Sequence, residues 1–92
     1  MNDFSFEVGR IVVSKQGRDK GRAFIVSELI NENFVMLIDG DLRKLSKPKL
    51  KKVKHLRSTP YMANDFISKL INKQNILDSD IRKEIGRIRE EC

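Results

Sequence analysis

The sequence predicts an α+β protein in which a small, strongly bent sheet or barrel of about five strands is followed by two short helices. Two observations predict this order. Between residues 8 and 57, short apolar runs rich in Val and Ile alternate with turn-forming residues. After Thr59-Pro60 no valine occurs, and apolar residues recur at helical spacing.

The charge divides at the same place as the expected fold. Residues 1–57 contain 13 Lys or Arg and 7 Asp or Glu, whereas residues 58–92 contain 6 of each. The whole net charge of +6 therefore belongs to the first part and favours a polyanionic partner for it. We expect a β domain over residues 4–57 and a helical appendage over residues 60–92, packed on or beside it.

The strands are expected where β-branched and aliphatic residues lie between turn signals. Asn31 to Asn33 and Asp39 to Asp41 are natural turns, since Asn tolerates left-handed conformations and Asp-Gly favours hairpins. Lys47-Pro48 should interrupt the chain, because Pro lacks an N–H donor. The expected strands are Val8 to Ser14, Ala23 to Ile30, Phe34 to Ile38, Leu42 to Leu45 and Val53 to Arg57.

Both helices are predicted from apolar stripes. A break is expected at Asn72 to Asn75, after which Asp78 or Ser79 can cap the second helix. The first stripe is Met62, Phe66, Ile67, Leu70 and Ile71, and the second is Ile81, Ile85 and Ile88.

A loop with two glycines and four cations separates the first two strands. Gly17 and Gly21 permit positive φ, so the chain can reverse sharply there. The cations around this bend can reach phosphate oxygens from a rigid base of strands, and they are Lys15, Arg18, Lys20 and Arg22. The spacing is neither a P-loop nor a dinucleotide fingerprint. Asp19 is not expected to touch an anion, and it can hydrogen-bond the backbone of the turn instead.

A second basic segment spans Arg43 to Arg57 and contains eight Lys or Arg and no acid. Eight like charges without counter-charge are tolerable if a polyanion supplies it. We expect contacts from Arg43, Lys44, Lys47, Lys49, Lys51, Lys52, Lys54, His55 and Arg57. The interleaved apolar residues Leu45, Leu50, Val53 and Leu56 are expected to anchor the segment to the core. The phenylalanines occupy strand-like positions, so base stacking on an exposed aromatic is not the evident mode.

From Gly9 to Arg57 the chain resembles a KOW domain, and more narrowly that of a large-subunit ribosomal protein family of archaea and eukaryotes. The resemblance is carried by Gly17-Arg18 with Gly21-Arg22, Ile25-Val26, Asn33-Phe34-Val35, Asp39-Gly40 and Lys54-His55-Leu56. It implies an SH3-like β-barrel that binds RNA, usually ribosomal RNA, through the cations of the loop and through residues 51–55. The length and charge balance suggest a bacterial stand-alone member.

The expected function is therefore non-catalytic RNA binding, with no cofactor, metal or small-molecule substrate. His55 is the single histidine and lies in a basic strand, where a phosphate or packing contact is commoner than catalysis. The stronger alternative is a protein-interaction module of the transcription or translation machinery, with the barrel or the helices contacting a ribosomal or other protein. DNA reading by the helices is disfavoured by Glu84, Glu90 and Glu91 on the second helix.

The sequence also predicts a cytoplasmic protein without a membrane partner. Met1 to Glu7 lacks the features of a signal peptide. The longest aliphatic or aromatic run, Phe34 to Ile38, is too short to span a bilayer. Cys92 is the single cysteine, which excludes an intramolecular disulfide.

Overall fold

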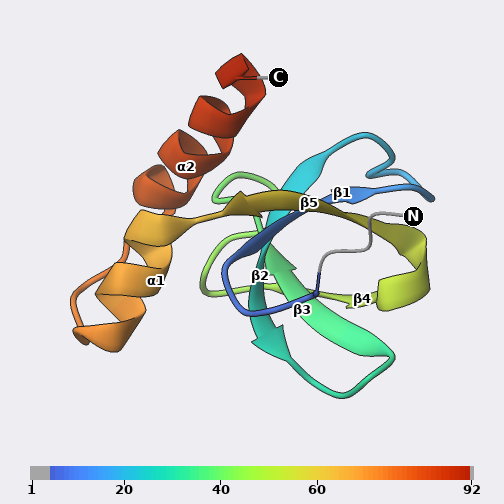
Figure 1. Cartoon of the computed structure of the whole chain (residues 1–92), viewed down its shortest axis with the longest axis horizontal. Helices are drawn as coiled ribbons and strands as arrows, with labels where there is room; N and C mark the ends of the chain where they lie inside the picture. The colour runs from blue at the N-terminus through green and yellow to red at the C-terminus, as the bar shows by residue number, and fades with distance from the viewer. Residues whose placement is uncertain (1–4, 92) are drawn as a thin grey trace.

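The computed structural model describes residues 5–91, so the expected domain limits at residues 4 and 92, and Cys92 itself, lie outside the described part. The fold is α+β, as predicted (Figure 1). Its elements are β1 (Arg10–Ser14), β2 (Ala23–Leu29), β3 (Phe34–Ile38), β4 (Lys49–Lys52), the 3₁₀ turn η1 (Val53–His55), β5 (Leu56–Met62), α1 (Asn64–Ile71) and α2 (Asp78–Glu91).

The five strands form one antiparallel sheet in the order β4-β3-β2-β1-β5, which is consistent with a small SH3-like barrel. Figure 1 shows both helices at one end of the molecule and η1 at the opposite end, with β5 running between them. The β1–β2 loop lies at the η1 end, away from the helices.

The fourth strand is not where the sequence predicts it. Leu42 to Leu45 is an irregular loop, and Leu42 is 60% exposed. The backbone N–H groups of Asp39 and Gly40 both donate to the carbonyl of Arg43, at 2.8 and 3.2 Å, and so close this loop on itself. The strand begins at Lys49, directly after Pro48, because a proline is tolerated at the start of an edge strand.

The last strand is longer than predicted and passes through Thr59-Pro60 to Met62, a residue that the sequence pattern assigns to the first helix. The pairing of β5 with β1 shifts register between Val12↔Ser58 and Arg10↔Met62. This irregularity accommodates Pro60, which has no N–H to donate. The Thr59 hydroxyl donates to the carbonyl of Ile11 at 2.7 Å, a side-chain bond within the irregular stretch.

Residues alternate along the strands between two buried clusters on the two faces of the sheet. The sheet-side core consists of Val12, Phe24, Val26, Val35, Leu37 and Leu56. The helix-side core consists of Ile11, Ile25, Ile38, Ala63, Phe66, Ile81 and Ile85. From α2 the isoleucines Ile81, Ile85 and Ile88 pack in this core, and from α1 only Phe66 and Ile67 do, whereas Leu70 and Ile71 stay exposed. The two helices thus lie against the β domain.

A side chain of α2 caps the start of α1. The buried carboxylate of Glu84 on α2 accepts a hydrogen bond from the N–H of Phe66 in the first turn of α1, at 3.0 Å. Asp80 reaches back to the N–H of Leu77 at 3.0 Å, which caps α2. The expected cap residue Asp78 instead accepts from the N–H of Leu45 at 2.8 Å and joins α2 to the β3–β4 loop.

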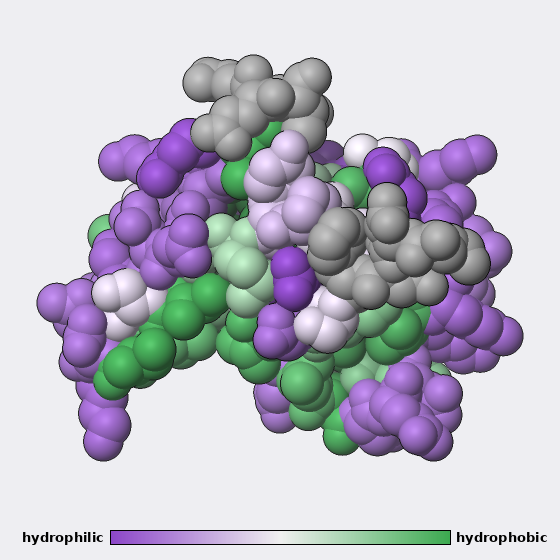
Figure 2. Space-filling view, viewed as in Figure 1, coloured by the Kyte–Doolittle hydropathy of each residue, from purple (hydrophilic) through white to green (hydrophobic). Residues whose placement is uncertain are grey.

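The surface is strongly divided in character. Figure 2 shows a hydrophobic area over α1 and a hydrophilic one over the end where η1 lies. Leu70, Ile71 and Leu77, at and after the end of α1, are 43%, 73% and 53% exposed. Among the described residues, no helix combines the length and apolar character needed to cross a bilayer.

Candidate nucleic-acid interface

The β1–β2 loop is held in shape by its own backbone. Gly17 and Gly21 have φ of 82° and 85°, which confirms the predicted left-handed conformation at both. The N–H of Gly21 donates to the carbonyl of Ser14 at 2.8 Å, and that of Arg22 donates to the carbonyl of Asp19 at 2.8 Å. The Ser14 hydroxyl adds a bond to the carbonyl of Gln16 at 2.9 Å. The loop is therefore an ordered platform for its exposed cations.

The two basic segments of the sequence meet in the fold. The N–H of Lys15 donates to the carbonyl of His55 at 2.8 Å, which sets the start of the loop beside η1. The Lys51 ammonium donates to the carbonyl of Gln16 at 3.3 Å, across the loop from β4. Lys51 and Gln16 are 35 positions apart in sequence, so the fold forms one surface from two distant segments.

The register of β4 decides which of its side chains reach the loop. Lys49 and Lys51 lie opposite Leu37 and Val35, so they share the face of the sheet-side core and reach toward the loop. Leu50 and Lys52 project from the other face. The prediction that Leu50 anchors the segment is therefore wrong, and its side chain is 52% exposed.

The other three expected anchors are confirmed. Leu56 is buried, and Val53 packs against the sheet-side core. Leu45 packs against the helix-side core. The basic segment is therefore fixed to the β domain at both of its ends.

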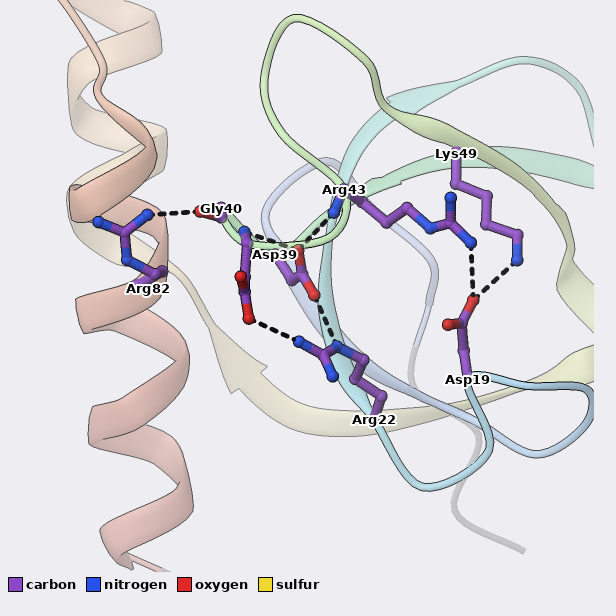
Figure 3. A network of polar contacts seen from close by, with 8 residues as sticks. Asp19, Arg22, Asp39, Gly40, Arg43, Lys49 and Arg82 are labelled. Carbon is purple, nitrogen blue, oxygen red and sulfur yellow. Dashed lines mark hydrogen bonds and ion pairs between the residues drawn. The ribbon is translucent and has the colours of Figure 1, made fainter.

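Asp19 ties the loop to the basic segment. Its carboxylate is only 6% exposed and accepts from the Lys49 ammonium at 2.7 Å and from the Arg43 guanidinium at 3.5 Å. The hydrogen bond from Lys49 is the main reason that the pKa of Asp19 lies below its usual value, although burial opposes the shift. The sequence predicts a bond from this side chain to the backbone of its own turn, but it bonds these two cations of β4 and the β3–β4 loop instead (Figure 3).

Arg22 is likewise committed to contacts within the protein. Its Nε donates to the buried Asp39 carboxylate at 2.7 Å (Figure 3). Its Nη2 donates to the Asp41 carboxylate at 3.0 Å. The hydrogen bond to Asp39 raises the pKa of Arg22 above its ordinary value. Asp39 also accepts from the N–H groups of Asp41 and Arg43, at 2.9 and 2.8 Å. The sequence predicts Asp39 and Asp41 only as turn formers. Nothing in their spacing indicates that they pair with Arg22.

The remaining cations of the two basic segments are free of ion pairs within the part of the chain that the structure describes. We define the basic surface as the cations of the loop and of the β4–η1 segment without an ion pair, with Lys52 at its edge because this side chain projects from the other face of β4. Its residues are Lys15, Arg18, Lys20, Lys51, Lys52, Lys54 and the neighbouring His55. Lys44, Lys47 and Arg57 are also exposed, but no hydrogen bond or ion pair joins Lys44 or Lys47 to the loop among the described residues.

His55 lies among the cations of this surface, and its surroundings lower its pKa. Its pKa lies below the usual value of 6.5, first because of partial burial and then because of the charges of Lys54, Lys51, Lys52 and Lys15. Ammonium groups from both basic segments therefore act on one imidazole. Burial and these cations both disfavour the charged form of His55.

An open hollow of about 430 Å³ borders the basic surface between the β2–β3 turn and η1. Its lining residues are Glu32, Asn33, Phe34, Lys52, Val53 and Lys54. The sequence does not predict this hollow. The exposure of Phe34 depends on which part of β3 the helices leave uncovered, and this follows only from the fold.

No model of a known protein family matches the chain. Within residues 5–88, whose side chains the structure describes, no group of three or more His, Cys, Asp or Glu side chains is arranged to hold a metal ion. The features of this surface that the structure establishes are thus an ordered loop, a fixed basic segment and the cations between them.

Replacing Asp19 by Asn should lower the free energy of unfolding by about 1–2 kcal/mol, because the buried, charge-assisted hydrogen bond from Lys49 is lost. The change also weakens the pairing of Arg43, whose Nε already lacks a hydrogen-bond partner in the described structure. Because the folded pKa of Asp19 is depressed, its contribution is complete above the unfolded value of 3.8 and is lost as the pH falls through the folded pKa. Urea unfolding at pH 7 and at pH 3 measures both effects. Equal destabilisation by the variant at the two pH values would contradict the assignment.

Proposed function

We propose that this chain is a non-catalytic RNA-binding protein of the KOW type, which clamps the phosphate backbone of folded RNA with its basic surface. The KOW resemblance and the acid-free basic segment support the proposal. Phosphate contacts supply affinity and orientation, while the shape of the RNA supplies selectivity. Ribosomal RNA is the partner that the resemblance favours, with the protein acting at the ribosome.

One observation supports this function best: the loop and the β4–η1 segment lie side by side with their outward cations unneutralised. Lys51 bridges them, and Lys15 is bonded to His55 at their junction. Arg22 pairs with the buried Asp39, and Arg43 and Lys49 pair with the buried Asp19, so the more exposed cations of the basic segments remain available. An array of unpaired cations on a rigid frame matches the repeating charges of a nucleic-acid backbone.

The predicted contact residues have two roles, holding the interface in shape and contacting phosphate. Arg22, Arg43 and Lys49 hold the loop and the basic segment in place, and Gly17 and Gly21 shape the bend. The contacts to phosphate come from the basic surface, with Lys44, Lys47 and Arg57 as outlying contributors to the field.

The double replacement of Arg18 and Lys20 by Ala should weaken binding to a folded RNA by roughly 10- to 50-fold at 0.1 M salt, because each cation that neutralises a phosphate strengthens binding by a few-fold. Both side chains are exposed, so the fold should be unaffected. Replacement of Lys73 and Lys83 by Ala removes the same charge from the helical appendage and is the matched control. Fluorescence anisotropy with a labelled ribosomal RNA hairpin measures the affinities, and equal weakening by both doubles would contradict a localised interface.

A protein partner is the second candidate, favoured by the exposed Leu70, Ile71 and Leu77 at the end of α1. Contacts of this kind are apolar, and their strength changes little with salt compared with phosphate contacts. The salt dependence of binding therefore separates the two candidates.

A further inference from the structure

The hollow beside the basic surface has walls that are fixed by backbone hydrogen bonds. The Asn31 side-chain oxygen accepts from the N–H groups of Asn33 and Phe34, at 2.8 and 3.0 Å, and so shapes the β2–β3 turn. The N–H of Val53 donates to the carbonyl of Asn33 at 2.8 Å and binds η1 to this turn. Both sides of the hollow are therefore preformed before any ligand arrives.

The ring of Phe34 lines the hollow and is part of neither buried core. It shares a face of β3 with Ile38, but the helices cover that face only near Ile38. Phe34 is half-buried and packs against neither buried cluster among the described residues. Lys52 lies opposite Phe34 in the pairing of β3 with β4, so the Lys52 side chain is on the same face of the sheet as the ring.

The charged groups of the hollow are of two kinds. Lys52 and Lys54 are exposed and continue the basic surface into it. Glu32 is the single acid of the lining. Neither its carboxylate nor the Asn33 side-chain amide has a hydrogen bond or ion pair within residues 5–88. An acid would repel a bare phosphate at this position, whereas it can accept hydrogen bonds from the edge of a base.

We propose that the hollow takes one unstacked nucleotide of the bound RNA, with its base against Phe34 and its phosphates held by Lys52 and Lys54. This inference rests on the proposed function and adds a base-reading subsite to it. The volume of about 430 Å³ falls within the range of roughly 300–1,000 Å³ typical of small-ligand sites. Aromatic rings at the edge of a basic groove are the usual platform for unstacked bases.

The base that fits this lining best is guanine. A carboxylate has two acceptor oxygens and no donor. Guanine presents two neighbouring N–H donors, N1–H and the N2 amino group, on one edge, and these match the two oxygens of Glu32. Adenine and cytosine each offer a single amino group on that edge. Asn33 can both donate and accept, so it adds contact without opposing this preference.

The test compares two RNA hairpins with the same number of phosphates, one fully paired and one with a single bulged guanosine. The full chain should bind the bulged hairpin about tenfold more tightly, the effect of stacking one base. Phe34→Leu removes the ring but keeps an apolar side chain, so it should abolish this difference and leave the affinity for the paired hairpin unchanged. Anisotropy titrations at 0.1 M salt measure all four affinities.

Bulged adenosine, cytidine and uridine in the same hairpin test the base preference. The wild-type protein should favour guanosine several-fold, and Glu32→Gln should remove that preference, since the amide replaces one acceptor oxygen by a donor. Equal binding of the paired and bulged hairpins, or a difference that survives Phe34→Leu, would overturn the subsite while leaving the phosphate clamp intact. Failure to bind either hairpin would overturn the proposed function and the subsite with it.

Discussion

Replacing Gly40 by Ala should lower the free energy of unfolding by about 3–5 kcal/mol, which combines a positive-φ penalty with a backbone clash. Gly40 has φ of 75°, and a methyl group there would overlap the carbonyl oxygen of Asp78. It would also lie 3.1 Å from atoms of Ile81 and Arg82, so α2 could not keep its place. Arg82 donates to the Gly40 carbonyl at 2.6 Å, and this bond would be strained as well (Figure 3).

Gly21 provides the matched control for this substitution. Its φ is 85°, but a methyl group there would meet no atom within 4 Å. Gly21→Ala should therefore cost only the conformational penalty, about 1 kcal/mol. Urea unfolding followed by circular dichroism measures both variants. Equal costs would show that the close packing of α2 on Gly40 contributes nothing to stability.

Replacing Asp39 by Ala should lower the free energy of unfolding by about 2–4 kcal/mol, because it leaves one guanidinium and two backbone N–H groups without their acceptor. The three bonds come from Arg22, Asp41 and Arg43, at 2.7, 2.9 and 2.8 Å. The Asp39 side chain is 4% exposed, so water cannot readily replace them. Thermal unfolding at pH 7 measures the destabilisation.

Asp41→Ala is the control for Asp39. The Asp41 carboxylate accepts from the same guanidinium at 3.0 Å but is 63% exposed, so its removal should cost at most about 0.5 kcal/mol. Both variants remove one negative charge from the same turn. A similar cost for the two would mean that the buried bonds of Asp39 do not stabilise the fold.

The sequence was most informative where local pattern and tertiary environment agree. The strand of Phe34 to Ile38 and the positive φ of Gly17 and Gly21 follow directly from residue type. The isoleucines of α2 lie on one helical face, and they pack where that face meets the sheet. These features depend on neighbours in sequence and can therefore be predicted without the fold.

The errors in strand placement have a different cause. Pro48 and Pro60 both indicated breaks, but each lies in or beside an edge strand, where a missing N–H is tolerated. The order of strands in the sheet decides which strands are edges, and this order is not visible in the local sequence. The exposure of Leu50 has the same origin, since its face follows from the register of β4 with β3.

The candidate interface was predictable as a region but not as a set of contacts. The segregation of charge marked both basic segments, and the fold brings them together at Lys15 and His55. Ion pairs between distant residues then separate the cations by role, as with Lys49 and Asp19, which are 30 positions apart. The number of charges in a segment can be read from the sequence, whereas only the fold shows which of these charges are paired with an acid.

The salt dependence of binding to a folded RNA tests the phosphate clamp most directly. A plot of log affinity against log salt has a slope of about −0.7 to −0.9 for each phosphate neutralised. The Arg18, Lys20 double Ala variant should therefore flatten the wild-type slope by about 1.4–1.8, while the Lys73, Lys83 control leaves it unchanged. A shallow wild-type slope, or one that the Arg18, Lys20 replacement leaves unaltered, would contradict the clamp.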